Sequence, residues 1–217
     1  MARPVALRRG RSAAAASEQL TTRDRILRAA VKLFQGSGFA GTGINDIVAA
    51  AGAPKGSVYH HFPGGKIQLG VEAVQFMSGE VEGLIERRVR DGVPPARILM
   101  DIARAMGGWL ERSGWREGCL ISVVAQETGP ADEELHAAVA ASYAAWTSHL
   151  RPAIVAQGFD QPQAAELADL AIAALEGGLI LARVRRSCEP LSTAARLAGR
   201  LMEPPQQDSS EQGQHLH

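Results

Sequence analysis

Three short helical patterns near the N-terminus constrain the fold of this chain more than any other feature. In residues 22–36, apolar side chains recur every three or four positions, and a glycine-containing stop follows. Residues 44–51 repeat the pattern and end at Gly52, and a third pattern covers residues 55–61. Two short helices joined by a tight glycine-containing turn, with another helix before them, have the layout of a helix-turn-helix unit.

The third pattern lies within the segment AGAPKGSVYHHF and combines an apolar pair with a polar face. Val58 and Phe62 are four positions apart, so both face the same small core. Small residues let the start of a helix approach base edges, and a lysine donates to guanine or to phosphate. We therefore predict that DNA is met in the major groove by the side chains that face outward or lie on the flanks: Lys55, Gly56, Ser57, Tyr59, His60 and His61.

Charge is divided unevenly along the chain, although the net charge of the whole sequence is zero. Residues 1–70 hold ten Lys and Arg against three Asp and Glu, a net charge of +7, which leaves −7 for residues 71–217. A basic N-terminal part followed by an acidic remainder indicates that the N-terminal part binds a polyanion. The alternative is a solvated arm, because four of these arginines lie in the first eleven residues.

Helical patterns continue through the rest of the chain, and no strand-like alternation of useful length occurs. Further helices are expected at residues 66–90, 95–113, 118–127, 132–157, 163–187 and 191–202. The predicted fold class is therefore all-α. The predicted division is a disordered basic arm at 1–20, a three-helix helix-turn-helix DNA-binding domain at 21–66, a C-terminal helical domain at 67–203 and a disordered polar tail at 204–217.

Neither a membrane span nor an export signal is predicted. The longest apolar stretch, LADLAIAALEGGLILARV, carries Asp169 and Glu176, which a membrane span would have to bury without visible partners. The N-terminal residues start basic but lack the apolar run of a signal peptide. We expect a cytoplasmic protein that has no membrane among its partners.

Residues 66–203 carry no phosphate loop, no nucleophile–base motif and no dinucleotide fingerprint. Cys119 and Cys188 lie far apart in apolar stretches, which favours reduced core thiols over a disulfide or a nucleophile. We predict no catalytic residue, no metal and no cofactor. Two alternative functions stay open on these grounds: a helical enzyme that uses Cys119 or His149, and a helical adaptor that binds a protein instead of DNA.

A family resemblance is carried by the segment TGINDIVAAAGAPKGSVYHHFPGGKIQL, which resembles the DNA-binding domain of the tetracycline-repressor (TetR) family. The FPGGK junction and the GCLISVVAQE and HLRPAI segments resemble the LmrA/YxaF-like branch. The resemblance implies a ligand-responsive transcriptional repressor that binds a palindromic operator as a homodimer and is released by a small hydrophobic effector. The branch implies a planar drug or flavonoid-like effector, and control of the repressor's own gene and a neighbouring exporter or oxidoreductase.

By position, the resemblance implies base contacts by Lys55, Gly56, Ser57 and Tyr59, and phosphate contacts by Thr42, His60, His61 and Lys66. Two positions depart from the family pattern, because Pro54 stands where a helix-capping serine is common and Ile67 replaces the usual acid.

Three of these residues have structural alternatives. Thr42 could serve only as an N-cap, and His61 could instead pack and hydrogen-bond a backbone carbonyl. A metal site at His60 and His61 is not expected, because adjacent helical side chains diverge by about 100° and no third ligand is near in sequence.

The resemblance also implies two tasks for the C-terminal helices. An effector pocket is implied among large or soft side chains and polar neighbours, namely Met106, Trp109, Trp115, Cys119, Val123, Gln126, Tyr143, Trp146 and His149. A four-helix dimer interface is implied where mostly small residues recur, namely Ala171, Ala174, Gly177, Gly178, Leu181, Ala194 and Ala198. For both sets the alternative is ordinary packing within one chain.

Overall fold

The computed structural model describes residues 20–129 and 132–204, and all regular secondary structure in these ranges is α-helical. The predicted all-α class is confirmed. The predicted basic arm and polar tail lie almost entirely outside the described residues. The helices are α1 (Thr22–Ser37), α2 (Ile44–Ala51), α3 (Ser57–His61), α4 (Gly65–Arg90), α5 (Pro95–Arg112), α6 (Leu120–Glu127), α7 (Glu133–Val155), α8 (Gln161–Arg185) and α9 (Glu189–Arg200).

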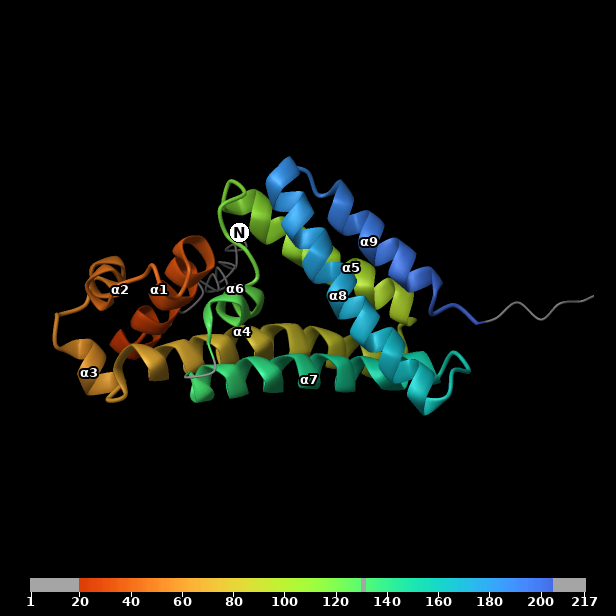
Figure 1. The fold of residues 1–217 in the computed structure, drawn as a ribbon, viewed down its shortest axis with the longest axis horizontal. Coiled ribbons are helices and arrows are strands. Elements are labelled where there is room, and N and C mark those ends of the chain that lie inside the picture. Colours follow the sequence, from red (N-terminus) through yellow and green to blue (C-terminus); the bar gives the residue numbers. More distant parts are fainter. Residues whose placement is uncertain (1–19, 130–131, 205–217) are drawn as a thin grey trace, which may run out of the picture.

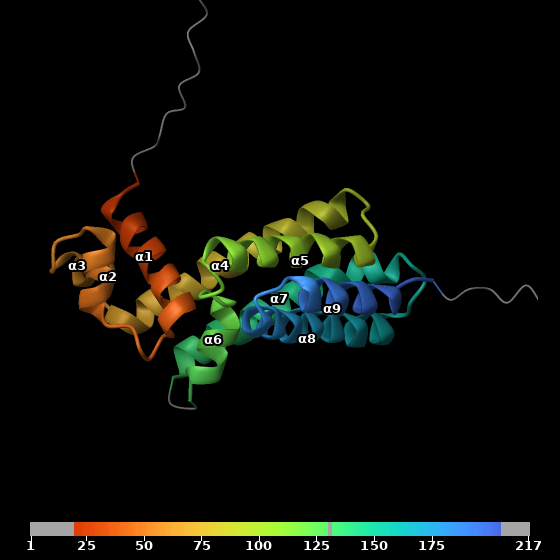
Figure 2. The ribbon, with the colours of Figure 1, turned by 90° about the horizontal axis from the view of Figure 1, so that it is seen from above.

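The molecule is elongated, with α1, α2 and α3 gathered at one end (Figures 1 and 2). From this end α4 runs along the molecule beside α7, while α8 packs against both α7 and α9. Helix α5 lies against α9 and α8. The short helix α6 contacts α1, α4 and α7, so it lies between the N-terminal helices and the helical body.

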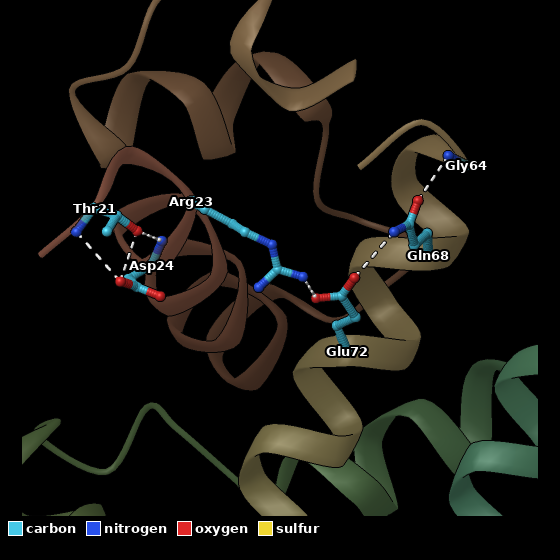
Figure 3. Close-up of polar contacts among 6 residues, drawn as sticks. All are labelled: Thr21, Arg23, Asp24, Gly64, Gln68 and Glu72. Atoms are coloured by element: carbon cyan, nitrogen blue, oxygen red, sulfur yellow. Dashed lines mark hydrogen bonds and ion pairs between the residues drawn. The ribbon is translucent and has the colours of Figure 1, made fainter. Parts of the chain in front are cut away.

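Helix α1 begins with a capping box formed by Thr21 and Asp24. The backbone N–H of Asp24 donates to the Thr21 hydroxyl oxygen at 3.1 Å, and the backbone N–H of Thr21 donates to the Asp24 carboxylate at 3.2 Å. The Thr21 hydroxyl also donates to this carboxylate at 2.7 Å, which lowers the pKa of Asp24 (Figure 3). Two amide groups that a helix start leaves unpaired are thereby satisfied.

Helix α3 is shorter than predicted, because it begins at Ser57 instead of residue 55. Gly52 ends α2 in the left-handed conformation, with φ of +58°. Lys55 and Gly56 then form a turn, in which the Ser57 backbone N–H donates to the Pro54 carbonyl at 2.9 Å. Pro54 therefore lies before the first turn of α3, because the tight turn closes on its carbonyl and the helix follows.

The remaining helices match their predicted ranges to within a few residues at each end. A cluster not predicted from the sequence joins α4 to α5, where buried Asp101 accepts from Arg104 at 2.7 Å and pairs with Arg88 at 3.0 Å and Arg97 at 3.5 Å. Within the described ranges, none of the helices combines the length and hydrophobicity needed to cross a membrane.

Candidate DNA interface and ligand cavity

The segment predicted to meet DNA presents most of its polar side chains to solvent. Its buried side is formed by Val58 and Phe62, neither of which has any exposed surface, as predicted from their spacing. Tyr59 is a large aromatic residue that keeps 61% of its surface exposed. The exposed residues are Lys55, Gly56, Tyr59 and His60, whereas Ser57 and His61 are half-buried.

A chain of polar contacts holds the end of α3 in place (Figure 3). The Gly64 backbone N–H donates to Gln68 at 2.8 Å, and the Gln68 amide donates to Glu72 at 3.0 Å. Glu72 in turn forms an ion pair with Arg23 of α1. The Arg23 guanidinium also lies 4.9 Å from the centre of the Phe62 ring. These contacts fix the end of α3 against α1 and α4. The outer face of α3 therefore has a defined orientation.

Glycine is required where α3 gives way to α4. Gly65 has a φ of +65°, and its backbone N–H donates to the Phe62 carbonyl at 2.8 Å. A residue with a Cβ is strained in this left-handed conformation. The turn between the two helices brings the start of α4 close to Tyr59, whose ring lies 3.5 Å from the position a Cβ on Gly65 would take.

Two predicted phosphate contacts have internal partners. Thr42 is only 3% exposed, and its hydroxyl donates to the Gly38 carbonyl at 2.7 Å. The alternative role of Thr42 as an N-cap was wrong, since Gly43 occupies that position. The Lys66 ammonium lies 4.5 Å from the centre of the Phe39 ring and donates to the Ala40 carbonyl at 3.4 Å. Both side chains therefore brace the loop between α1 and α2.

The two histidines of α3 lie together instead of diverging. The ring centres of His60 and His61 are 4.8 Å apart, with the planes at 72°. The expected divergence was wrong because helical geometry fixes the Cβ directions, whereas χ1 and χ2 decide where the rings lie. Among the residues that the structure describes, no group of three or more His, Cys, Asp or Glu side chains is arranged to hold a metal ion.

A nearly closed cavity lies inside the helical body, between α4, α5, α6, α7 and α8. About 20 Å³ of it is open to the centre of a water molecule, which is room for about one water. Four residues predicted for an effector pocket line it: Met106, Trp109, Cys119 and Trp146. The sequence analysis did not select the other lining residues: Met77, Val81, Ile102, Leu120, Ile121, Ile172, Leu175 and Glu176.

The other predicted pocket residues lie elsewhere. Tyr143 does not line the cavity, but its ring is edge-on to that of Trp146, with the ring centres 5.5 Å apart. His149 is at the surface, 3.4 Å from the Glu86 carboxylate, and does not line the cavity. An open hollow of about 700 Å³ between α1, α6 and α8 is lined instead by Trp115, Val123 and Gln126.

Glu176 is the acidic residue of the cavity wall. Both carboxylate oxygens are buried, and neither has a hydrogen-bond partner in the described part of the protein. Burial raises the pKa of Glu176, and the nearby Cys119 thiol and Ser122 hydroxyl offset this only in part. The same environment raises the pKa of the Cys119 thiol, which is buried as predicted. The sequence did contain a signal for this site, because Glu176 interrupts the longest apolar stretch.

The small residues predicted for a dimer interface divide into two groups. Ala171, Gly178 and Ala198 are buried within the chain. A Cβ on Gly178 would lie 3.0 Å from both Ala194 and Leu191, so this glycine lets α8 and α9 approach each other. Ala174 and Ala194 are half-buried, whereas Gly177 and Leu181 are exposed. Leucines that were not predicted are also exposed here: Leu170 on α8, Leu197 on α9 and Leu201 directly after α9.

Comparison with known proteins bears on both halves of the chain. The family model for bacterial regulatory proteins of the tetR family matches residues 26–72. The model for the C-terminal domain of LmrA/YxaF-like transcriptional regulators matches residues 95–197. The HTH-type transcriptional regulator LmrA of Bacillus subtilis (strain 168) is 34% identical over 170 residues, which cover 78% of this chain and 90% of that protein. The chain belongs to the TetR family.

Two further proteins are similar over most of their length. The HTH-type transcriptional regulator Rv0196 of Mycobacterium tuberculosis (strain ATCC 25618 / H37Rv) is 37% identical over 179 residues, covering 80% of this chain and 90% of that protein. The crystal structure of a TetR transcriptional regulator from Legionella pneumophila matches with a TM-score of 0.76, covering 85% of this chain and 98% of that one; at 21% identity it shows the fold alone. TetR-family proteins are regulators that bind DNA and dimerise, and they are not enzymes.

Proposed function

We propose that this TetR-family protein is a ligand-responsive repressor, which binds a palindromic operator as a homodimer and leaves it when a small hydrophobic effector enters the interior cavity. One observation carries the proposal: a single short helix, α6, contributes to the cavity wall at one end and holds the DNA-binding end of the molecule at the other. A regulator that binds DNA works in the compartment that holds the DNA, so we propose a cytoplasmic location.

The DNA-binding unit in this proposal is residues 21–66, and the effector-binding and dimerisation unit is residues 67–203. Base contacts come from the exposed Lys55, Gly56 and Tyr59, together with Ser57. His60 and His61 reach phosphates, while Thr42 and Lys66 act mainly by bracing the loop before α2. Because α3 is only about one turn long, one copy reads few base pairs and two copies are needed.

The dimer surface in this proposal is the exposed face of α8 and α9. Leu170, Leu181, Leu197 and Leu201 each keep between 44% and 56% of their surface exposed. A cluster of half-exposed leucines on two adjacent helices is typical of a surface that a partner covers. Since Gly177 and Ala174 lie on the same helix, a second copy of α8 could approach closely there.

Coupling between the two sites runs through α6 in this proposal. Cys119, Leu120 and Ile121 at its start line the cavity. Just before the helix, the backbone N–H of Gly118 donates to the Gln35 carbonyl of α1 at 3.1 Å. The Gln35 side-chain amide donates back to the Gly118 carbonyl at the same distance.

The far end of α6 makes the second connection. The Glu127 carboxylate accepts from the backbone N–H of Ala40, in the loop after α1, at 2.8 Å. A ligand that enlarges the cavity pushes on the start of α6, and both contacts transmit that movement to α1 and α2. The spacing between the two copies of α3 then no longer fits the operator.

Selection from random double-stranded DNA tests the DNA half of the proposal. The wild-type protein should enrich palindromes whose half-sites lie about one helical turn apart, or a multiple of it. Enrichment of a single unrepeated half-site, or of no sequence, would contradict it. For the effector half, hydrophobic compounds that raise the melting temperature should also release the selected operator in a gel-shift titration.

A variant of the α6 connection tests the coupling. Glu127→Ala should bind such a compound as the wild type does, but require more of it to release the operator. The matched control is Glu133→Ala, which changes an exposed glutamate at the start of α7. Equal release by the Glu127 variant and the wild type would remove α6 from the proposed route.

A further inference from the structure

The cavity holds one acidic side chain, Glu176, that has no hydrogen-bond partner among the described residues. Glu176 points from α8 into the lining, and both of its carboxylate oxygens are buried without a hydrogen bond from any described residue. Leaving a buried carboxylate unpaired is costly, and in most folds a cationic side chain or several amide groups surround such an acid. The side chains around this one are mostly apolar and aromatic, and its polar neighbours, the Cys119 thiol and the Ser122 hydroxyl, carry no positive charge.

Within residues 20–129 and 132–204, the ionisable groups near Glu176 bring no positive charge. They are the Cys119 thiol, at the start of α6, and the Tyr143 phenol of α7; burial together with the acid raises the pKa of both. The wall residues of α4 and α5 are Met77, Val81, Ile102, Met106 and Trp109, none of them ionisable. Arg183, two turns further along α8, lines the open hollow and not the cavity.

Two tryptophans add a second feature that suits a cation. Trp109 and Trp146 both line the cavity, and indole faces attract cations, most strongly when water is excluded. The Trp146 N–H is already used, since it donates to the Ser78 carbonyl at 3.2 Å, so this ring offers no further hydrogen bond from its nitrogen. Aromatic walls around a single acid form a site that favours a positive charge over a negative one.

We propose that the effector is a lipophilic organic cation, whose protonated nitrogen pairs with Glu176 while its apolar part lies against Trp109 and Trp146. This rests on the proposed effector role of the cavity and names the chemical class that the cavity takes. Entry requires the wall to move, because only about 20 Å³ is open to a water centre. Met77 and Met106 are the flexible wall residues that yield most easily.

A pair of probes that differ in charge alone tests the proposal. They are 2-(2-naphthyl)ethylamine, which is protonated at neutral pH, and 2-(2-naphthyl)ethanol, which is neutral. Isothermal titration calorimetry on the full chain without DNA should show that the amine binds at least about tenfold more tightly than the alcohol, as a buried charge-assisted bond predicts. In Glu176→Gln that preference should disappear, with binding of the alcohol unchanged within about twofold.

The control is Asp169→Asn, which removes an exposed acid from the same helix and should leave the preference intact. Equal binding of the two probes by the wild type, or an amine preference that persists in Glu176→Gln, would overturn the inference. A gel-shift titration separates this inference from the proposed function. If the amine binds through Glu176 but does not release the operator, the proposed effector role is contradicted, whereas the cation site at Glu176 is supported. If the amine releases wild type and Glu176→Gln at equal concentrations, and the alcohol releases them as readily as the amine does, the effector role is supported and the cation site is contradicted.

Discussion

The two ends of this protein place their polar groups in opposite ways. At the DNA-binding end, polar side chains face outward, and those that turn inward have partners close by, as in the Arg23–Glu72–Gln68–Gly64 chain. In the helical body, the Glu176 carboxylate faces inward and has no partner among the described residues. A surface that meets a large charged partner keeps its polar groups in water until binding. In our proposal, the cavity keeps this one group unpaired for a small ligand.

The largest effect is expected from breaking the proposed dimer surface, which in our proposal holds the two DNA-binding ends at the spacing of the operator. Leu181→Arg places a charge in the exposed leucine face of α8 and should yield monomers by light scattering. Operator affinity should then fall by about 100-fold or more, since one copy contacts only one half-site. Asp169→Arg, an exposed position on the same helix, is the control and should remain dimeric.

Gly178 is not suitable for this test, although the sequence analysis included it among the residues implied for the dimer interface. An arginine there would meet Leu191 and Ala194 of the same chain and disturb the α8–α9 packing itself. A Leu181→Arg protein that is still dimeric would place the interface on another face.

The next largest effect concerns the outward face of the DNA-binding end. Tyr59→Ala and Lys55→Ala should each weaken operator binding by about 10- to 100-fold without loss of stability, because both side chains are exposed. Phe62→Ala, one turn away and fully buried, should instead destabilise the fold by about 3–5 kcal/mol. Gel-shift titration and thermal unfolding separate these outcomes, and unchanged binding by the Tyr59 and Lys55 variants would remove both from the interface.

A smaller effect, opposite in sign, is expected in the cavity. Glu176→Gln should stabilise the ligand-free protein by about 1–3 kcal/mol at neutral pH, because it removes an unpaired buried charge. The pKa of Glu176 is raised on folding, so the wild type loses stability as the pH rises from the ordinary carboxyl value of 4.5 through the raised folded value. The difference in melting temperature between variant and wild type should therefore grow with pH over that window. A difference that does not vary with pH would show that the carboxylate is solvated.

The smallest effect compares two lysines at the DNA-binding end. Lys55 is exposed, whereas the Lys66 ammonium is placed over the Phe39 ring and on the Ala40 carbonyl. Lys55→Ala should reduce the slope of log K against log salt by about one if this lysine neutralises one phosphate. Lys66→Ala should change the slope less and lower the melting temperature more. Equal slopes for both variants would show that Lys66 also reaches a phosphate.

Much of the DNA-binding end could be predicted because its signals are local. The capping box of Thr21 and Asp24, the stop at Gly52 and the inward positions of Val58 and Phe62 all depend on residues at most four positions apart. The wrong predictions at this end concern side chains whose positions depend on their own torsion angles and not on the backbone. Sequence spacing sets Cβ directions, but not the meeting of the His60 and His61 rings, nor the inward turn of the Thr42 hydroxyl.

The sequence by itself determined which segments are helical and which face of each is apolar, because backbone hydrogen bonding and hydrophobic periodicity repeat over a few residues. Only the tertiary structure decided which apolar faces meet. The cavity draws Met77, Trp109, Cys119, Trp146 and Glu176 from five helices, and His149 falls outside it because its part of α7 faces Glu86 at the surface. Which side chains meet depends on how the helices cross and pack, and this is a property of the whole core that no single segment contains.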